Sequence, residues 1–547
     1  MGGMSNAHVR GPSEPALLHQ TIGANLRAVA ARFGTREALV SSAQEIRLTY
    51  AELDAEVDRV ARALLARGIA KGDRVGVWSP NCAEWTLLQF ATARAGAILV
   101  NVNPAYRTSE LAYALRQSGT RLLFAPRAFK TSNYAGMVAE VAPELDVVWL
   151  DGDPSWTAFL ASAAATPGGA LAEREATLDP GDPINIQYTS GTTGAPKGAT
   201  LSHVNILNNG YLVGEGCRYT EADRVCIPVP FYHCFGMVMG NLGAVTHGAC
   251  MVIPAPAFDP GATLAAVEAE RCTSLYGVPT MFIAELDHPD FGSFDLGSLR
   301  TGIMAGSPCP VEVMRRVIED LHMDEVTICY GMTETSPVST QTAVDDPVDK
   351  RVGTVGRVHP HLEVRVADPA TGATCAVGET GELCTRGYSV MVGYWEDPER
   401  TAEVLDDEGW MHTGDLATID EDGYANIVGR IKDMIIRGGE NVYPRELEEF
   451  LYGHPDIADV QVIGVPDARY GEELMAWVIP RAGVANLAPE AVREFCRGQV
   501  AHFKVPRYVK VVDAFPMTVT GKVQKFKLRE AAIAELGLGG AAGIRTA

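Results

Sequence analysis

The chain has 547 residues, 47% of them hydrophobic and 21% charged, which is typical of a globular protein and too long for one simple core, so we expect two or more domains. The formal net charge of −22 argues against general nucleic-acid binding, which needs a basic surface. The 11 cysteines are scattered, without a CxxC pair or a Cys/His cluster, so we expect reduced thiols in a cytoplasm and no structural zinc site.

The ends of the chain and its most apolar region predict neither secretion nor a membrane span. Residues 1–15 are polar and contain no apolar signal core, and the final residues, 545–547, match neither a prenylation box nor a peroxisomal signal. The most apolar region, residues 235–258, is interrupted by Asn241, His247 and two prolines, which is typical of buried strands and helix. We therefore expect a cytoplasmic protein without a transmembrane segment.

The first part of the chain, from Leu17 to Leu150, alternates short apolar runs with amphipathic helical patterns. Thr49 and Glu52 form a capping-box pattern, which predicts a helix through Leu65. This alternation predicts a parallel sheet with crossover helices. We predict strands at residues 74–78, 97–101 and 121–125, and helices at residues 82–95 and 109–117.

The second part of the chain continues the same pattern, so we expect two lobes rich in βα units. A strand at residues 184–188 leads into a glycine-rich loop, and Ser202 would cap the helix that follows. We further predict strands at residues 225–230, 250–253, 274–278 and 326–329, and helices at residues 262–269 and 311–321.

The glycine-rich loop at residues 188–198 has the sequence Tyr-Thr-Ser-Gly-Thr-Thr-Gly-Ala-Pro-Lys-Gly. Glycine lets the backbone approach a ligand closely, successive N–H groups form an anion-binding nest, and Lys197 adds a positive charge. Such a loop suits a polyphosphate, and we expect it between a strand and a helix. It is not a Walker A loop, because Pro196 precedes the lysine and Gly198 follows it. A plain surface loop is the alternative interpretation of this composition.

The character of the sequence changes at residue 351 and again near residue 430. Residues 351–395 are rich in glycine and proline and alternate in polarity, which predicts antiparallel β-structure in a small barrel-like subdomain. Beyond this region, an α+β pattern predicts strands at residues 433–436, 460–465 and 476–479, and helices at residues 444–451 and 491–500. The expected domain plan is a flexible N-terminus (1–16), an N-terminal α/β domain (17–429) with the β subdomain at about 351–429, a junction (430–433), a C-terminal α+β domain (434–535) and a flexible tail (536–547).

The loop at residues 188–198 resembles the signature loop of adenylate-forming (AMP-binding) enzymes, which include acyl-CoA synthetases, peptide-synthetase adenylation domains and firefly luciferase. The nearest resemblance is to medium- or long-chain acyl-CoA synthetases, through residues 103–106, 110–111 and 521–528. The similarity extends from about residue 17 to residue 527. Further motifs that resemble this family occur in its order at residues 330–335, 412–415, 429–433, 437–441 and 520–523.

The resemblance implies an ATP site in the N-terminal domain. Tyr330 would lie against adenine, Glu334 would bind Mg²⁺, and Thr335 or Thr333 would lie near the phosphate. Without the resemblance, an ordinary turn with a solvated glutamate is the simpler interpretation of these residues. The phosphates of ATP would contact the signature loop at Thr189, Ser190, Gly191, Thr192, Thr193, Gly194 and Lys197.

The resemblance also implies roles for residues in and near the C-terminal domain. Asp415 would accept hydrogen bonds from both ribose hydroxyls, and Arg430 would reach the ribose. Lys522 would contact the α-phosphate and the substrate carboxylate. Lys432 stands at the position of the hinge about which a mobile C-terminal domain would rotate between the two half-reactions. The coenzyme A tunnel would be bordered by Gly438 and Gly439.

The acid pocket implied by the resemblance includes residues 231–237. Amino-acid-activating relatives carry an aspartate at the position of Tyr232, so an amino acid substrate is disfavoured. The apolar wall of this segment suits an alkyl or aryl tail. His233 would lie at the carboxylate entrance, although a packed or backbone-bonded histidine is an equal alternative. The expected pocket residues are Tyr232, His233, Phe235, Met237, Val238, Gly306 and Gly331.

We therefore expect an ATP-dependent acyl-CoA synthetase that uses Mg²⁺, forms an acyl-adenylate and pyrophosphate, and then transfers the acyl group to coenzyme A with release of AMP. A ligase for an aryl acid is one alternative. Luciferase-like oxidation is another, because the His-x-Phe-Gly-Met run at residues 233–237 is similar in luciferase. An inactive nucleotide-binding module is disfavoured, because Lys197, Glu334, Asp415 and Lys522 are all present. The chain length of the acid and a homodimeric state stay open.

Overall fold

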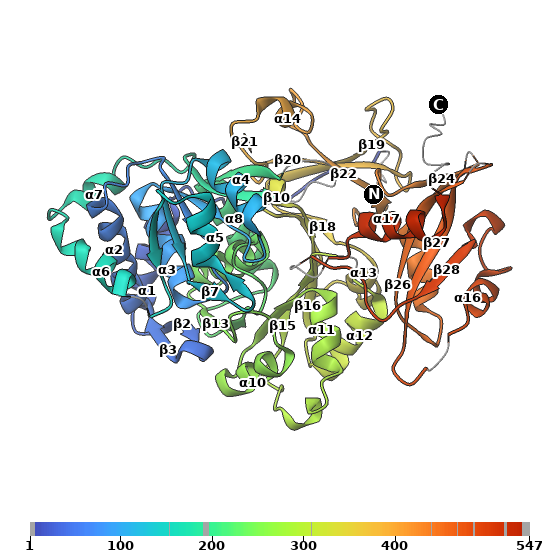
Figure 1. Ribbon diagram of the computed structural model, residues 1–547, viewed down its shortest axis with the longest axis horizontal. Coiled ribbons are helices and arrows are strands. Elements are labelled where there is room, and N and C mark those ends of the chain that lie inside the picture. Colours follow the sequence, from blue (N-terminus) through green and yellow to red (C-terminus); the bar gives the residue numbers. More distant parts are fainter. Residues whose placement is uncertain are drawn as a thin grey trace. The chain divides into compact units, whose positions relative to one another are not determined.

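The computed structural model describes residues 6–152, 154–189, 196–307, 309–438, 440–467, 469–484, 487–518 and 522–538 (Figure 1). This part of the chain divides into two compact units. The large unit consists of residues 9–364 and 385–412, and the small unit of the described parts of residues 1–8, 365–384 and 413–547. The expected α/β fold is confirmed, with mixed sheets, an antiparallel sheet and a small α+β region. The domain boundaries given above stay a prediction.

The first sheet of the large unit contains the strands that flank the predicted phosphate loop. Within the described residues its strands are, in sheet order, β21 (Gly393–Tyr394), β11 (Lys197–Ser202), β10 (Pro183–Thr189), β5 (Ile98–Asn101), β4 (Arg74–Val77), β6 (Leu122–Ala125) and β9 (Asp146–Trp149). From β10 to β9 neighbouring strands are parallel, whereas β11 pairs antiparallel with β10 and with β21. The parallel sheet predicted from the alternation of apolar runs is thus confirmed.

The second sheet of the large unit also has a parallel centre with antiparallel edges. Its strands in the described part of the chain are, in sheet order, β18 (Arg357–Val358), β17 (Val338–Gln341), β16 (Glu325–Gly331), β15 (Thr301–Ala305), β14 (Ser274–Gly277), β12 (Arg224–Cys226), β13 (Cys250–Ile253), β2 (Glu37–Ser41) and β3 (Ile46–Thr49). From β16 to β2 neighbouring strands are parallel. The carboxyl ends of these strands therefore meet at one edge of the sheet, where α/β proteins bind their ligands.

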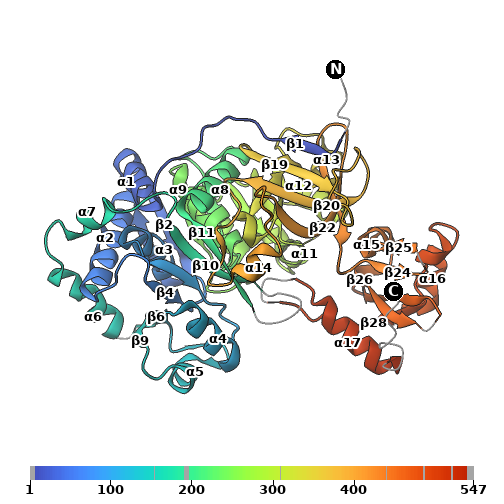
Figure 2. The ribbon, with the colours of Figure 1, turned by 90° about the horizontal axis from the view of Figure 1, so that it is seen from above.

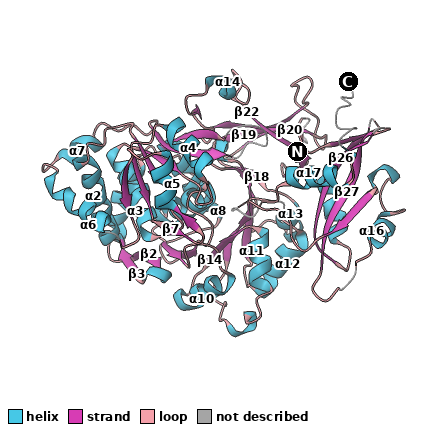
Figure 3. Ribbon diagram, in the orientation of Figure 1, coloured by secondary structure: helices cyan, strands magenta, loops and turns pink. Residues whose placement is uncertain are grey.

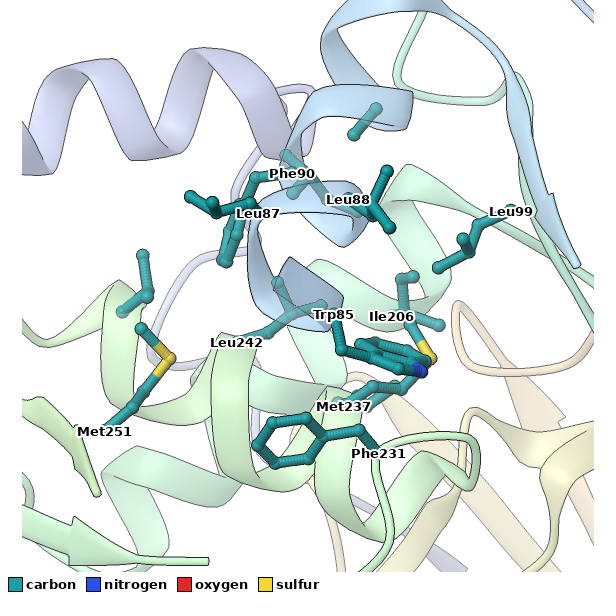
Figure 4. Packing of buried hydrophobic residues seen from close by; sticks show 14 of the residues in the cluster. Trp85, Leu87, Leu88, Phe90, Leu99, Ile206, Phe231, Met237, Leu242 and Met251 are labelled. Atoms are coloured by element: carbon teal, nitrogen blue, oxygen red, sulfur yellow. The ribbon is translucent and has the colours of Figure 1, made fainter. Parts of the chain in front are cut away.

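Helix α3 (Ala83–Ala95) lies at the centre of the largest apolar cluster. Every residue of α3 except Glu84 is buried, as expected for a helix with no polar face. Trp85 of this helix packs against Phe231, with ring centroids 5.7 Å apart (Figure 4). Met237 lies beside the same indole in the close-up view. The segment assigned to the acid pocket therefore packs against the buried helix α3.

Side chains of the first sheet point alternately to its two faces. One face packs into the largest apolar cluster, which we call the central cluster, and the other packs against an outer layer of helices. Leu99 of β5 belongs to the central cluster, whereas its neighbours Ile98 and Val100 belong to the outer one. This period of two is that of a strand buried on both faces. The central cluster also contains residues of α1 (Ile22–Phe33), α2 (Tyr50–Ala66) and α8 (His203–Gly216). The outer helices are α4 (Thr108–Ser118) and α5 (Tyr134–Val141) on the first sheet, and α10 (Pro260–Glu270), α11 (Pro279–Leu286) and α12 (Val311–Asp320) on the second (Figure 1).

The large unit also contains further short helices and strands. They are β7 (Ala128–Phe129), β8 (Ser132–Asn133), α6 (Pro154–Ser162), α7 (Ala170–Glu175), α9 (Gly243–Thr246), α13 (Val348–Gly353) and α14 (Pro398–Ala402).

A third sheet contains much of the antiparallel β-structure predicted for residues 351–395 and the segment after them, although β18 and β21 of this region pair in the second and first sheets. The barrel-like shape of the subdomain stays a prediction. The strands of the third sheet, as far as the chain is described, are in sheet order β1 (His8–Arg10), β19 (Leu362–Ala367), β20 (Gly381–Gly387), β22 (Met411–Ile419) and β23 (Ala425–Arg430). The pairing of β22 with β23 is antiparallel and sets Asp415 opposite Arg430.

The rest of the small unit is a sheet with helices on both faces (Figures 2 and 3). Val460 and Val462 share an apolar cluster with helices α15 (Pro444–Tyr452) and α16 (Pro489–Cys496), whereas Ile463 and Val465 pack with α17 (Lys525–Glu535). This alternation gives three layers and confirms the predicted α+β pattern. The elements are β24 (Ile435–Arg437), β25 (Glu440–Val442), α15 (Pro444–Tyr452), β26 (Ile457–Asp467), β27 (Gly471–Pro480), α16 (Pro489–Cys496), β28 (Tyr508–Val511) and α17 (Lys525–Glu535).

Local sequence signals predict the element boundaries well in several places. Thr49 and Glu52 form the expected capping box at the start of α2, and Ser202 caps α8. One prediction is wrong: the loop after β10 does not lead directly into a helix. It joins β10 to the antiparallel strand β11, and α8 begins only after that strand. The short run of small residues in β11 gave too weak a strand signal to separate the loop from the helix.

The described helices were also compared with the dimensions of a lipid bilayer. None of those in the described ranges combines the length and the apolar character needed to cross a membrane.

Candidate active site

Strands β10 and β11 present the two ends of the predicted phosphate loop. Their register pairs Thr189 with Lys197, the last residue of one strand and the first of the other. The phosphate contacts assigned to residues 190–194 lie outside the described residues. The Nζ atom of Lys197 lies 4.7 Å from the ring centroid of Tyr394, which is a cation–π contact. Within the described ranges, this ammonium group has no carboxylate partner.

Glu334 lies in a short 3₁₀ helix, η5 (Thr333–Thr335), that follows β16. Only 5% of its surface is exposed. The Oη atom of Tyr394 donates a 2.8 Å hydrogen bond to Glu334 Oε1, and the second oxygen, Oε2, receives none from the described residues. Burial, together with the neighbouring carboxylate, raises the pKa of the Tyr394 phenol, so this hydroxyl stays protonated and acts as the donor.

The turn that carries Glu334 is held by backbone contacts that tolerate no larger side chain. A Cβ atom on Gly331 would lie 1.7 Å from the carbonyl oxygen of Pro337, so glycine is required there. The hydroxyl of Thr335 is fully buried, accepts a hydrogen bond from the N–H of Met332 and donates one of 2.8 Å to Pro337. Thr335 therefore stabilises the turn, and its expected place near the phosphate stays a prediction.

Two further predicted residues lie at the carboxyl ends of adjacent parallel strands. Tyr330 is half-buried near the end of β16, and Gly306 directly follows β15. The register pairs Ala305 with Cys329, so Tyr330 and Gly306 occupy neighbouring positions at this edge. Gly306 has a φ of +93°, which glycine adopts without strain. This edge of a parallel sheet is the usual place for a nucleotide.

A segment at residues 388–395, which we call the strap, contacts both the turn that carries Glu334 and the strand that begins with Lys197. The N–H of Met391 donates a 2.9 Å hydrogen bond to the carbonyl of Glu334. The N–H of Trp395 donates one of 2.7 Å to the carbonyl of Gly198, and β21 within the strap pairs with β11. Sequence analysis assigned no role to the strap, since Tyr394 is 60 residues from Glu334. The Gly-Tyr-Trp run at its end was the one signal available.

The predicted acid segment begins a π-helix, η3 (Phe235–Leu242). Such turns occur frequently at functional sites. Phe235 stacks on Tyr276 with ring centroids 5.6 Å apart, and Met237 and Val238 are buried in the central cluster. All three side chains are buried among apolar neighbours, and their contact with a substrate stays a prediction.

Tyr232 and His233 precede the π-helix and are partly exposed. The hydroxyl of Tyr232 is buried and has no hydrogen-bond partner among the described residues, and its burial raises the pKa of the phenol. The Nδ1 atom of His233 accepts a 3.2 Å hydrogen bond from the N–H of Phe235. A neutral His233 therefore carries its proton on Nε2. The backbone-bonded alternative for this histidine is thus present, and its place at the carboxylate entrance stays a prediction.

Three buried amides behind the acid segment form a cluster that sequence analysis missed. The sulfur of Met237 accepts hydrogen bonds from Asn101 Nδ2 at 3.1 Å and Gln187 Nε2 at 3.2 Å. Gln187 also donates to Asn185 and accepts from the thiol of Cys234. Polar residues at alternate positions of a strand normally indicate a solvent-facing side, but here they satisfy one another inside the protein. The cluster connects β10 to the start of the π-helix.

In the small unit, the structure brings together the two residues expected at the ribose. Asp415 and Arg430 face each other across β22 and β23, and Arg430 Nε donates a 3.0 Å hydrogen bond to Asp415 Oδ1. The carboxylate is mostly buried, whereas 56% of the arginine side chain is exposed. An exposed guanidinium beside a buried carboxylate can turn toward a ligand without unfolding its strand.

The expected hinge and coenzyme A residues lie on turns of the small unit. Lys432 is exposed in the turn that joins β23 to β24. Gly438 is also exposed, has a φ of +60°, and donates a 2.8 Å hydrogen bond from its N–H to the carbonyl of Tyr470. Gly439 lies outside the described residues. Glycine adopts this positive φ without strain, and the place of Gly438 beside coenzyme A stays a prediction.

The backbone of Lys522 forms two hydrogen bonds with Thr518. Its N–H donates to the hydroxyl of Thr518 at 3.0 Å, and its carbonyl accepts from the N–H of Thr518 at 2.7 Å. Three residues later, Lys525 Nζ donates to Glu448 Oε1 at 2.6 Å and to the carbonyl of Val462 at 3.2 Å. This ion pair fixes the first residue of α17 to α15 and β26.

Comparison with known proteins gives consistent matches over almost the whole chain. Residues 26–395 match the family model described as AMP-binding enzyme, and residues 446–522 match that of the AMP-binding enzyme C-terminal domain. The chain is 48% identical over 539 residues to YngI of Bacillus subtilis (strain 168), by name an acyl-CoA synthetase, which covers 94% of this chain and 98% of that protein. It is 44% identical over 556 residues to the mitochondrial medium-chain acyl-CoA ligase ACSF2 of Rattus norvegicus, which covers 97% and 90%. Among solved structures, ATP-bound MatB from Rhodopseudomonas palustris matches with a TM-score of 0.82 and 34% identity, covering 94% of this chain and 99% of that one.

Proposed function

Because the chain belongs to the AMP-binding enzyme family and is an acyl-CoA ligase, we propose that it activates a medium-chain fatty acid in two steps at the residues described above. In the first step, a carboxylate oxygen bonds to the α-phosphorus of ATP and the bond to pyrophosphate breaks. In the second step, the sulfur of coenzyme A bonds to the acyl carbon, the bond to AMP breaks and the thiol proton is released. The protein's main task in such a reaction is to position the reactants and neutralise charge.

In the large unit, we assign the phosphates of ATP to Lys197 and the loop that precedes it. Glu334 is the residue we propose as a ligand of Mg²⁺, since one of its oxygens receives no hydrogen bond from the described residues. Carboxylate oxygens are the donors that this hard cation prefers. When bound, Mg²⁺ would neutralise negative charge on the phosphates. Lys197, which lies on the ring face of Tyr394, supplies the second positive charge.

In the small unit, we assign the ribose to Asp415 and Arg430, which already form a cross-strand pair. Lys522 would stabilise negative charge at the α-phosphate during the first step only. Gly438 would border coenzyme A in the second step. The hinge at Lys432 would let one small unit serve both steps in turn. Support for these roles comes from the motifs and from the placement of each residue within the small unit.

The acid is proposed from three observations. A full-length relative is named as a medium-chain acyl-CoA ligase. The side chains of Phe235, Met237 and Val238 are apolar and buried. Tyr232 stands where an amino-acid-activating relative would carry an aspartate. A role in fatty acid metabolism follows from these points. The cytoplasmic location and the homodimer stay predictions, and one relative is named as mitochondrial.

The test of this proposal is a panel of acids assayed for pyrophosphate release and for thioester formation, with and without coenzyme A. We expect octanoate to be activated faster than benzoate, and phenylalanine to be activated least. Thioester formation should require coenzyme A, whereas adenylate formation should not. A clear preference for phenylalanine, or release of pyrophosphate with no thioester product, would overturn the assignment.

A further inference from the structure

Tyr394 lies between the two charged residues proposed to bind the phosphates and the metal. Its ring face carries the ammonium group of Lys197, 4.7 Å from the ring centroid. Its hydroxyl donates a 2.8 Å hydrogen bond to Glu334 Oε1. Only 6% of Tyr394 is exposed, so both contacts are shielded from water and correspondingly strong.

The backbone around Tyr394 is fixed to the same two elements. Within the strap, Tyr394 pairs with Ala199 of β11, and its N–H donates a 2.9 Å hydrogen bond to the hydroxyl of Thr401. On the other side, Ser336, which follows η5, donates a 2.6 Å hydrogen bond from its hydroxyl to the carbonyl of Ser389 in the strap. The ring therefore has a defined position relative to both charges.

A lysine and a buried glutamate in one site would form a direct ion pair if nothing separated them. Such a pair would have to break before the lysine could contact phosphate and the carboxylate could contact a metal. In the described residues, however, Lys197 has no carboxylate partner and Glu334 Oε2 receives no hydrogen bond. Tyr394 supplies a partner for each charge that does not neutralise it.

We propose that Tyr394 is a positioning residue for the ATP complex, which separates Lys197 from Glu334 and keeps both ready for the nucleotide and its divalent cation. The inference rests on the proposed function, because it assumes that these two charges meet ATP. In this proposal Tyr394 acts through Lys197 and Glu334 and not on a reacting atom. Its hydroxyl orients the carboxylate so that Oε2 remains available, and its ring face holds the ammonium group.

The two contacts of Tyr394 can be removed one at a time. Tyr394→Phe removes the hydrogen bond to Glu334 but keeps the ring under Lys197. Loss of a hydrogen bond to a charged group corresponds to about a tenfold effect. We therefore expect about tenfold more Mg²⁺ to be needed for half-maximal ATP binding, measured by calorimetry at fixed ATP without the acid. Tyr394→Leu also removes the ring, and should weaken ATP binding by a further factor of about three to ten.

A matched control is Tyr134→Phe. Tyr134 is another buried tyrosine of the large unit, whose hydroxyl donates 2.6 Å to the carbonyl of Pro104. Loss of this hydrogen bond in Tyr134→Phe should leave the Mg²⁺ dependence of ATP binding unchanged. A folding defect is detected by a second measurement, conversion of isolated acyl-adenylate to thioester, which should stay at the parent rate in Tyr394→Phe.

Glu334→Gln separates failure of this inference from failure of the proposed function. If Glu334→Gln binds ATP with the Mg²⁺ dependence of the parent, the proposed metal role of Glu334 is wrong. If Glu334→Gln loses this dependence while Tyr394→Phe keeps that of the parent, only the role of Tyr394 is overturned. An equal loss in both half-reactions for Tyr394→Phe would also contradict it, because that result indicates general damage to the fold.

Discussion

The two units hold their proposed functional residues in different ways. In the large unit, Glu334 is 5% exposed and its carboxylate is fixed by Tyr394, which also carries Lys197. In the small unit, by contrast, Lys432 and Gly438 are exposed on turns. Charges held in place before the ligand arrives cost no reorganisation when it binds. The contrast favours the proposal that the phosphate and metal part of the ATP site is preformed in the large unit, whereas Lys522 and Gly438 of the small unit would each act in one step.

The largest effect should come from removing Lys522, the lysine proposed to act in the first step only. Lys522→Ala should slow adenylate formation by roughly a hundredfold or more, about 3–4 kcal/mol, because one charge-stabilising contact is lost in the transition state. Conversion of supplied acyl-adenylate to thioester should continue. Single-turnover assays of each half-reaction measure both rates. Equal loss in the two would show that Lys522 has no step-specific role.

The opposite pattern should follow from fixing the turn between β23 and β24. Lys432→Pro would restrict φ to about −65° and would also restrict Ile431 before it. If Lys432 changes conformation between steps, thioester formation should fall by roughly tenfold or more while adenylation persists. Lys432→Ala is the matched control and should leave both rates near those of the parent. A proline variant that forms thioester at the parent rate would exclude this hinge.

A smaller loss of adenylation should follow from breaking the ion pair between Lys525 and Glu448, three residues after Lys522. Lys525→Met removes the contact with Glu448 and Val462 that fixes the start of α17, so Lys522 loses its support on one side. We expect adenylation to fall by about tenfold, as small misplacements of catalytic groups do. Thioester formation, for which we propose Gly438 rather than Lys522, should change little.

The control for Lys525 is Lys510→Met, because Lys510 pairs with Glu535 at the other end of α17. It removes a lysine–glutamate pair from the same helix without touching the segment of Lys522. If Lys510→Met slows adenylation as much as Lys525→Met does, the effect is one of general stability. Lys525→Arg should restore most of the adenylation rate, since it keeps the charge.

The smallest effect at neutral pH concerns a buried histidine of the large unit. Burial lowers the pKa of His359 from 6.5 to about 4, and its Nδ1 has no hydrogen-bond partner among the described residues. Because the folded pKa lies below the unfolded one, the unfolded state takes up the proton first. The contribution of neutral His359 to the free energy of unfolding is therefore complete above pH 6.5. It falls by about 3 kcal/mol as the pH decreases toward 4.

Denaturant unfolding at several pH values, read by the tryptophans of the large unit, measures this loss. His359→Gln can still donate a hydrogen bond to Gln341, the partner of His359 Nε2 at 2.8 Å. It should therefore flatten the decline in the free energy of unfolding between pH 6.5 and 4, and leave both half-reactions at pH 7 unchanged. A decline equal to that of the parent would exclude His359 as its source.

The parts of the fold that follow from local signals could be predicted from the sequence. The capping box at Thr49 and the period-two pattern of β26 are examples, because neighbouring residues decide them. β11 was missed, since its strand character depends on pairing with β10 and β21. The same reason explains Tyr394: its role arises from contacts with Lys197 and Glu334 that no local pattern encodes.

The candidate site likewise contains residues that the sequence predicted and residues that it did not. Motif resemblance predicted that Asp415 and Arg430 act together, and the register of β22 and β23 sets them opposite each other. It gave no indication of the amide cluster behind the acid segment, because Asn185 and Gln187 alternate like the polar side of an exposed strand. Only the three-dimensional arrangement shows that these amides are buried and satisfied by one another.

The claim that the phosphate and metal part of the ATP site is preformed in the large unit is tested most directly by the affinity for ATP and Mg²⁺ in two variants. Equilibrium binding should be measured by calorimetry for Lys522→Ala and Glu334→Gln, without the acid substrate. We predict that Lys522→Ala binds the nucleotide as tightly as the parent although it hardly forms adenylate, and that Glu334→Gln binds it much more weakly. If Lys522→Ala weakens binding as much as it slows adenylation, the nucleotide depends on Lys522 before the reaction begins, and the claim of a phosphate and metal site preformed in the large unit is wrong.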